Sequence, residues 1–243
     1  MIDMLGVGVP LADGWLLHRV CARVYDGSLV AVCSPHRDER TALLDAVSGR
    51  IVPAEGRVWI NGVAVRKGRA ARLRELVGEV ESVTGLVPHR SALWNVLADR
   101  TSLGGIRNLW RFPRARDRHA ALRAMATAGL DGRSREPVAN LALPVRLRLA
   151  VARALWRNPK FLVIREAESW LDGSAAAELL MLVRGLARSE RLGALVSGAP
   201  TESLLAAADR VLFLSGGLLV FDGAPADLAG SRAFLASAAT ARS

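Results

Sequence analysis

LVAVCSPHRDERTALL, from Leu29 to Leu44, is the stretch that decides the fold of this chain. It begins with an apolar run, continues through a short polar segment and ends in residues with helical spacing, which predicts a strand, a tight loop and a helix. This is the layout of a phosphate-binding loop with the pattern G-x-x-x-x-G-K-[ST]. Ser34 and Glu39 stand where that pattern requires glycines, and Arg40 stands where it requires lysine. Thr41 alone matches, at the position of the hydroxyl that holds magnesium.

The side chains of this loop are unfavourable for binding a nucleotide. Glycines let successive backbone N–H groups point at the phosphates, whereas Arg37, Asp38 and Glu39 bring side chains into that space. A non-glycine residue forced into the left-handed conformation costs about 1–2 kcal/mol, and each carboxylate repels a triphosphate by about 1 kcal/mol in water. Arg40 keeps the positive charge of lysine on a flat guanidinium. The segment is therefore either a phosphate-binding loop that has lost its chemistry or a strand, turn and helix that never bound phosphate.

The composition predicts a globular cytosolic protein. The chain has 243 residues, half of them hydrophobic, which is enough for a large core. No apolar run approaches the roughly 20 residues that span a bilayer, and no signal peptide is expected at Met1. Cys21 and Cys33 suggest neither a disulfide framework nor a metal site. The net charge of +10 permits contact with nucleic acid or an anionic membrane. Arginines dispersed over solvated faces are the simpler interpretation, and nucleic acid is not an expected partner.

Apolar runs and turn residues predict an order of strands and helices. Strands are expected at residues 4–9, 16–24, 29–33, 76–83, 161–164, 193–197, 210–214 and 218–221, with a break at Pro10. Helices are expected at 41–47, across a helix-rich region from 91 to 155 with an amphipathic segment at 107–123, at 175–188 and from 225 onward. Asn61-Gly62, between two alternating runs, is a strong hairpin signal. Strands that alternate with helices indicate an α/β fold with a parallel sheet.

Several segments, in their order along the chain, resemble the ATP-binding cassette of ABC transporters. They are GRVWING at 56–62, LVPHRSALWNVL at 86–97, LRLAVARALWRNPKFLVI at 147–164, SWLD at 169–172 and ADRVLFLSGGLLVFDG at 208–223. The second of these, with LWRFPRARDR at 109–118, is most similar to import ATPases for phosphonate or phosphite. The resemblance implies a single cassette domain over 1–243, with a mixed sheet, an antiparallel β subdomain and a helical subdomain at about 91–155.

The same resemblance implies positions for the family's functional residues, and most of them carry the wrong residue here. The phosphate-binding loop comprises Ser34, Arg37, Glu39, Arg40 and Thr41. The signature motif falls on Leu141, Ala142, Leu143, Pro144 and Val145, which lack its serine and glycines. Walker B, normally Asp-Glu, is Arg165-Glu166, and the switch histidine position falls on Ala199. The glutamine loop has no glutamine near Ser82, Val9 and Pro10 cannot stack on adenine as the family's aromatic residue does, and Trp15 is the nearest aromatic side chain.

Three positions keep a residue of the family pattern, and each has an ordinary structural alternative. Glu166 holds the place of the general base, or is a charged strand end paired with Arg165 or another neighbour. Thr41 holds the place of the magnesium hydroxyl, or is a helix N-cap. Asp172 belongs to the D-loop, or caps the helix that follows it.

These observations favour a catalytically degenerate cassette that serves as a structural or regulatory component of a phosphonate-type importer. No cofactor and no metal are then expected, and the partners are a transmembrane permease, docked near residues 83–96, and a homo- or heterodimeric cassette. The expected location is the cytoplasm, on the inner face of the cell membrane. One alternative is a working ATPase that binds Mg-ATP with Arg40 in place of the lysine. Another is a basic scaffold protein that binds nucleic acid.

Overall fold

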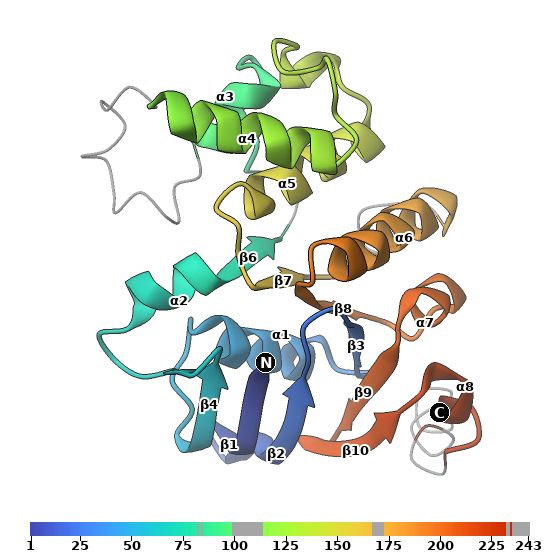
Figure 1. Ribbon diagram of the computed structural model, residues 1–243. Coiled ribbons are helices and arrows are strands. Elements are labelled where there is room, and N and C mark those ends of the chain that lie inside the picture. Colours follow the sequence, from blue (N-terminus) through green and yellow to red (C-terminus); the bar gives the residue numbers. More distant parts are fainter. Residues whose placement is uncertain (82, 84, 99–113, 167–172, 232–233, 235–243) are drawn as a thin grey trace.

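The computed structural model describes residues 1–81, 83, 85–98, 114–166, 173–231 and 234. Its strands form a four-stranded antiparallel sheet in the order β2-β1-β4-β5 and a six-stranded sheet in the order β10-β9-β3-β8-β7-β6 (Figure 1). The first sheet comprises β1 (Ile2–Leu11), β2 (Gly14–Val24), β4 (Glu55–Ile60) and β5 (Val63–Ala64). The second comprises β3 (Leu29–Cys33), β6 (Val77–Val80), β7 (Phe161–Ile164), β8 (Gly193–Gly198), β9 (Arg210–Ser215) and β10 (Leu218–Gly223).

The larger sheet is parallel except at one edge, where β10 returns antiparallel to β9. All five residues of β3 are buried, because the strand lies between β8 and β9 and both of its faces are covered. A strand buried on two faces reads as a continuous apolar run. This is why the segment 29–33 shows no alternation of polar and apolar residues.

Helices cover both faces of this sheet. The described helices are α1 (Arg37–Ser48), α2 (Ala70–Leu76), α3 (Ala92–Leu97), α4 (Ala115–Thr127), α5 (Leu143–Leu155), α6 (Gly173–Ser189), α7 (Glu202–Ala207) and α8 (Pro225–Leu228). None of them is both long and apolar enough to cross a membrane.

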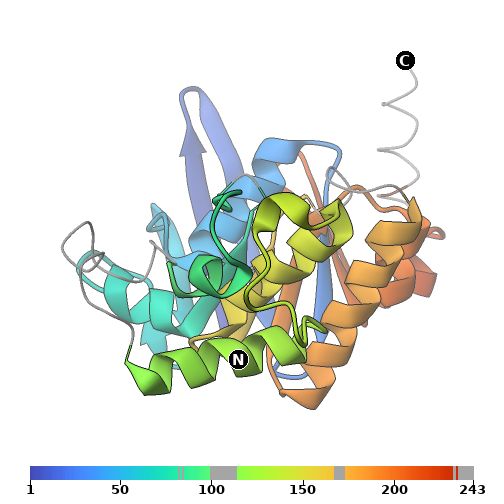
Figure 2. The same ribbon diagram turned by 90° about the horizontal axis from the view of Figure 1, so that it is seen from above.

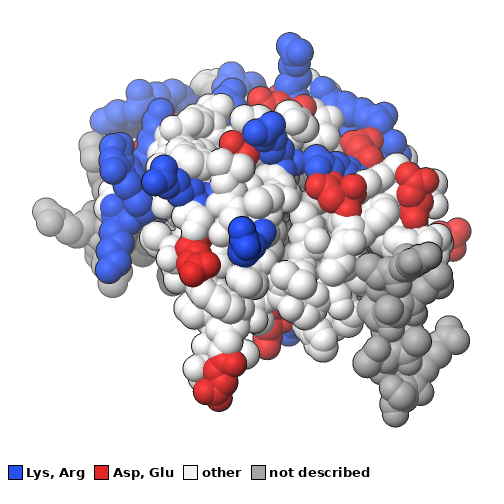
Figure 3. Space-filling model, turned by 90° about the horizontal axis from the view of Figure 1, so that it is seen from below, with Lys and Arg blue, Asp and Glu red and all other residues white. Residues whose placement is uncertain are grey.

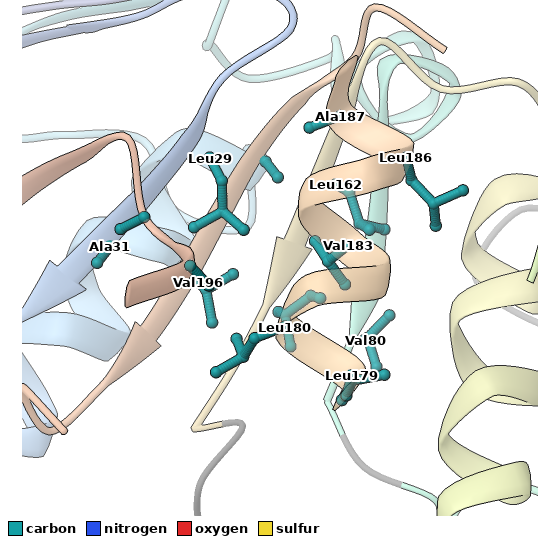
Figure 4. Packing of buried hydrophobic residues seen from close by; sticks show 14 of the residues in the cluster. Leu29, Ala31, Val80, Leu162, Leu179, Leu180, Val183, Leu186, Ala187 and Val196 are labelled. Atoms are coloured by element: carbon teal, nitrogen blue, oxygen red, sulfur yellow. The ribbon is translucent and has the colours of Figure 1, made fainter. Parts of the chain in front are cut away.

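The side chains of β3 divide between two hydrophobic clusters. Leu29, Ala31 and Cys33 pack with α5, α6 and α7, and Figure 4 shows α6 lying against this face of the sheet. Val30 and Val32 point the other way and pack with α1 and the four-stranded sheet. Successive side chains of a strand point to opposite faces. A single buried strand therefore joins the two halves of the core.

Helices α3, α4 and α5 share a third hydrophobic cluster and lie together in both ribbon views (Figures 1 and 2). They occupy the region from 91 to 155 for which the sequence predicts helices. Residues 99–113 lie outside the described part of the chain, so the predicted amphipathic segment at 107–123 is described only from Arg114 onward. The described part of it is helical from Ala115.

The predicted strands at 161–164, 193–197 and 210–214 are confirmed as β7, β8 and β9 to within one residue. The predicted hairpin is confirmed as well, since Asn61 and Gly62 have φ angles of 47° and 79° and connect β4 to β5.

Three expectations about element boundaries are wrong, and two short helices carry no expectation. Helix α1 begins at Arg37, four positions before the expected start at Thr41. The strand expected at 76–83 is only Val77–Val80, since Leu76 ends α2. Pro10 does not break β1, because it lies near the end of the strand opposite Trp15. Helices α2 and α7 were not predicted from the sequence, because seven and six residues carry too little periodic signal.

Gly56 provides a test of how closely the antiparallel sheet is packed. Its φ is +71°, and a Cβ built on it would lie 2.1 Å from the carbonyl oxygen of Gly6 and 2.3 Å from that of Leu5. Both are backbone atoms of β1 that cannot rotate away. We expect Gly56→Ala to lower the free energy of unfolding in urea by about 3 kcal/mol.

The matched control for this substitution is Gly62→Ala, in the hairpin turn. Gly62 also has a positive φ, +79°, but a Cβ there meets nothing within 4 Å. Gly62→Ala then introduces only the strain of a left-handed backbone, which lowers the free energy of unfolding by about 1 kcal/mol. Equal losses at the two positions would contradict the close approach of β1 to Gly56.

Candidate functional site

The site forms where β3, β7 and β8 end and α1 begins. Only Ser34, Pro35 and His36 connect β3 to α1, and no glycine lies among them. Residues 37–39 are helical, so the left-handed strain expected for them is absent. Thr41 lies inside the helix, and the N-cap residue is His36, so the alternative interpretation of Thr41 as an N-cap is wrong.

Arg40 is buried, and its guanidinium forms a two-pronged ion pair with Glu166. Its Nε donates to Oε1 of Glu166 at 2.9 Å, and its Nη2 donates to Oε2 of the same carboxylate. Its Nη1 donates to the carbonyl oxygen of Ser34. A planar guanidinium matches a carboxylate in this geometry, which a lysine ammonium cannot do. The cation expected at the lysine position of the loop thus lies against the carboxylate expected at the general-base position.

Glu166 is held by contacts from two other elements of the structure, α1 and β8. Its backbone N–H donates to Oγ of Ser197 at 3.0 Å, and that hydroxyl donates to Oε1 of Glu166 at 3.0 Å. Arg37 lies 4.0 Å from its Oε2. The φ of Glu166 is 50°, a left-handed conformation that a non-glycine residue adopts only when its surroundings fix it. Of the two partners expected for a charged strand end at Glu166, Arg165 or another neighbour, the structure shows the second, because its partner is Arg40 of α1.

These contacts lower the pKa of Glu166. Burial opposes its ionisation, but the hydrogen bond and charge of Arg40 outweigh that effect, with further contributions from Ser197 and Arg37. The net pKa lies below the ordinary value of 4.5. The pair is therefore ionised near neutral pH.

Glu39 also points into the protein. It is 4% exposed, and its Oε2 accepts a hydrogen bond from Oγ of Ser34 at 2.5 Å. Its Oε1 accepts from the backbone N–H of Gly217 at 2.7 Å, in the turn between β9 and β10. Both oxygens are thus occupied by groups of the chain, and the carboxylate ties α1 to the β9–β10 hairpin.

Arg165, at the end of β7, lies among carboxylates. Its Nη2 is 2.8 Å from Oδ1 of Asp45 and 3.1 Å from Oε2 of Glu79. Its Nε is 3.7 Å from Oε1 of Glu81, and Arg50 pairs with both glutamates. This five-residue network connects α1 to β6 and β7. Arg165, which is expected to stand in the place of the Walker B carboxylate, is therefore neutralised within the chain.

The signature segment and the switch position carry no charged side chain and are not members of these two ion clusters. In the signature segment Leu141 is buried, Ala142 is the N-cap of α5, and Leu143 is 42% exposed at the start of that helix. Ala199 directly follows β8. The trio Leu143, Pro144 and Val145 forms the first turn of α5. Asp172 and Ser82 lie outside the described residues.

Trp15 stacks on a neighbouring side chain of its own strand. Its ring lies parallel to that of His18, with the centroids 5.5 Å apart. A Cβ built on Gly8 would lie 2.9 Å from the Trp15 ring, so the ring covers this glycine of β1.

A cavity of about 520 Å³ lies beside the Arg165 network. Its lining includes Arg50, Glu79 and Glu81 of that network, together with Arg74 of α2 and Trp94 of α3. Residues 85–88 complete the side toward α3. The cavity overlaps the region 83–96, where the resemblance implies a permease contact.

Sequence reasoning missed Ser197, Gly217, Asp45 and Glu79. Each lies far along the chain from the charged group that it contacts, and no motif marks it. Within the described ranges, no group of three or more His, Cys, Asp or Glu side chains is arranged to hold a metal ion.

The fold and the position of this site define a cassette-type α/β protein, and comparison with known proteins agrees. A family model described as "ABC transporter" matches residues 40–169. The "Phosphonates import ATP-binding protein PhnC" of Frankia casuarinae is 33% identical over 228 residues, which cover 92% of this chain and 90% of that protein. The "Phosphonates import ATP-binding protein PhnC 1" of Trichodesmium erythraeum is 27% identical over 94% of this chain and 92% of its own length.

Solved structures show the same fold at lower sequence identity. The ATP-binding cassette MJ1267 in its ADP conformation has a TM-score of 0.88 at 15% identity, and 98% of each chain is covered. The cassette cbiO1 of Clostridium perfringens, part of the cbiONQ complex, has a TM-score of 0.81 at 18% identity, over 99% of this chain and 94% of that one. This chain belongs to the ABC transporter ATP-binding cassette family. The expected α/β cassette fold, with its antiparallel β subdomain and mixed sheet, is confirmed.

The buried pair of Arg40 and Glu166 can be tested by a double-mutant cycle. We expect Arg40→Met and Glu166→Gln each to lower the free energy of unfolding by about 3 kcal/mol at pH 7, because each leaves a buried charge without its partner. The double variant should lose about 1–3 kcal/mol less than the sum of the single losses. Urea unfolding measures all four proteins.

The control cycle uses Arg72 and Glu75, an exposed pair at 2.7 Å on α2. Its coupling should stay near 0.3–0.5 kcal/mol, as for surface pairs on helices. Strict additivity at Arg40 and Glu166 would contradict the ion pair.

The low pKa of Glu166 predicts a pH dependence of stability. A carboxyl whose pKa is depressed on folding stabilises the protein above its unfolded pKa, and that stabilisation is lost as pH falls through the folded pKa. The gap in unfolding free energy between the natural protein and Glu166→Gln should therefore be full above about pH 5 and shrink below about pH 4. Urea unfolding at a series of pH values measures the gap. A gap that grows on acidification would have the wrong sign for this interpretation.

Proposed function

We propose that the chain is the cassette subunit of an ABC importer for phosphonate-like substrates. The support is the similarity to the two PhnC proteins, which extends over at least 90% of each relative. In this role the chain pairs with a second cassette and receives a segment of the permease in the 520 Å³ cavity beside Glu79 and Trp94. The protein then lies at the inner face of the membrane that holds the permease.

Within this role we propose that the chain does not hydrolyse ATP. The observation that carries the proposal is the buried ion pair of Arg40 and Glu166. A P-loop lysine acts by contacting the β- and γ-phosphates. A catalytic carboxylate acts by orienting the nucleophile that attacks the γ-phosphate. Here the two groups at those positions satisfy each other. A phosphate that entered would have to break this buried pair and leave Glu166 with only the exposed Arg37, 4.0 Å away, as a countercharge.

The neighbouring positions support the same conclusion. The carboxylate of Glu39 lies where phosphate oxygens would need N–H donors, and the three-residue connection leaves no glycine-lined loop. Arg165 brings a cation to the place of a magnesium-binding carboxylate, and Asp45 and Glu79 are engaged in neutralising it. The site does not fit Mg-ATP, and no catalytic step is assigned to it.

The signature segment and the switch position extend this argument to the dimer. Leu143, Pro144 and Val145 offer no side-chain donor to a phosphate on a second cassette, and Ala199 has none either. A heterodimer with a complete cassette is consistent with these residues, because such a partner can supply its own P-loop.

The second candidate is a working ATP-binding subunit, and the comparisons favour it. The relatives are named ATP-binding proteins, and nothing in the comparisons indicates a loss of activity in this chain. In that case Arg40 leaves Glu166 and takes the place of the lysine, so that the ion pair is a resting state which nucleotide opens.

Measurements of Mg-ATP binding and turnover separate the two candidates. We expect the purified chain to show no ATP turnover, and calorimetry to give an affinity at least about a hundredfold weaker than that of the Frankia casuarinae relative, a difference of about 3 kcal/mol. Micromolar affinity together with turnover would establish the working subunit.

A repaired variant tests whether the loss is confined to the loop. Glu39→Gly with Arg40→Lys restores two residues of the P-loop pattern, but it leaves Arg165, the signature segment and Ala199 unchanged. Groups that act as a unit in phosphoryl transfer are not replaced by restoring one of them. We expect no turnover from this variant, and turnover near that of the Frankia relative would refute the proposal.

A further inference from the structure

A basic surface forms where β4 passes through β5 into α2. Between residues 57 and 74 the chain carries six cations and no carboxylate, although its net charge over 243 residues is only +10. The basic surface consists of Arg57, Arg66, Lys67, Arg69, Arg72 and Arg74. More than half of the net charge of the protein is therefore concentrated on one short segment.

The charges of the basic surface are exposed and mostly uncompensated. All six residues are exposed, and blue atoms gather along the left of Figure 3, on the side where Figure 1 places β4 and α2. Of these six residues, only Arg72 has an ion-pair partner within the described part of the chain. That partner is Glu75, and both side chains of the pair are more than half exposed. Such a pair holds its members weakly. The arginines of the site, in contrast, are neutralised by neighbouring carboxylates.

The position of the basic surface points to its partner. Arg74 also lines the 520 Å³ cavity, together with Val77 and Gly78 at the start of β6. Our proposed function assigns this cavity to a cytoplasmic segment of the permease, and the inference rests on that assignment. A surface that adjoins the permease contact lies near the membrane that holds the permease.

The chemistry of the basic surface fits a flat anionic layer better than a nucleic acid. Trp59 is the one aromatic residue in this segment, and it is half-buried, so bases have no exposed ring on which to stack. Helix α2 has seven residues and leads directly into β6. Long basic side chains on a short loop and helix can reach headgroups within the roughly 8–10 Å over which charges act in physiological salt.

We infer that the basic surface binds anionic phospholipid headgroups at the inner face of the membrane, beside the permease contact. Each basic side chain near an anionic leaflet strengthens binding about fivefold. The contact would orient the cassette before and during its association with the permease.

Vesicle binding by the full chain tests this inference. The probe is vesicles of equal parts phosphatidylglycerol and phosphatidylcholine, without permease or nucleotide, and sedimentation measures the bound fraction. The test variant is Arg66→Gln, Lys67→Gln and Arg69→Gln, which removes three unpaired cations. We expect it to bind about a hundredfold more weakly than the natural chain. About 0.5 M salt should abolish binding by the natural chain.

The matched control removes the same charge from exposed arginines elsewhere, as Arg118→Gln, Arg135→Gln and Arg191→Gln. We expect this control variant to bind the vesicles less than about fivefold more weakly than the natural chain. Circular dichroism of both variants should match that of the natural chain. A substitution set that unfolds the protein is replaced by the single variants Lys67→Gln and Arg118→Gln, which are compared in the same way.

Three results would overturn the inference. They are an equal loss in the control, equal binding to pure phosphatidylcholine vesicles, and binding to duplex DNA or single-stranded RNA that is tighter than to vesicles and is lost in the test variant. The vesicle assay contains no nucleotide, so its result is independent of whether the chain hydrolyses ATP. ATP turnover by the chain would in turn refute its inactivity without changing vesicle binding.

Discussion

The buried ion pair between Arg40 and Glu166 is the contact on which the arrangement of the site depends. A charge removed from water must be neutralised, or it destabilises the fold by several kcal/mol. The planar guanidinium and the carboxylate satisfy this requirement together, and Ser197 and Ser34 supply the remaining hydrogen bonds. The pair fixes the first turn of α1 against the ends of β7 and β8. It also holds the left-handed backbone of Glu166 in place.

The same constraint explains the second ion cluster. Arg165 is buried beside α1, and Asp45, Glu79 and Glu81 surround it, while Arg50 balances the surplus of carboxylates. Interior charges are thus paired within the chain, whereas the cations of the basic surface meet solvent. The paired charges of the site therefore oppose the binding of a phosphate. The exposed cations of the basic surface attract an anionic ligand.

Much of the fold could be predicted because its signals are local. The apolar runs at 161–164 and 193–197 indicate strands buried on two faces, and Asn61-Gly62 provides the positive φ angles of a hairpin turn. The short helices α2 and α7 gave no comparable signal. The start of α1 was misplaced because the resemblance to a phosphate-binding loop suggested a longer loop than the three residues that the chain uses.

The sequence by itself determined the family and much of the order of strands and helices, since each of these depends on neighbouring residues or on a fixed motif, and it marked the unusual residues at the positions that the resemblance implies. Only the tertiary structure decided how the unusual residues are accommodated. Arg40 and Glu166 are 126 positions apart, and Glu39 and Gly217 are 178 positions apart. No periodicity or propensity connects such residues. Their pairing follows from the parallel sheet, which brings the ends of distant strands to one edge and leaves the buried charges to find partners there.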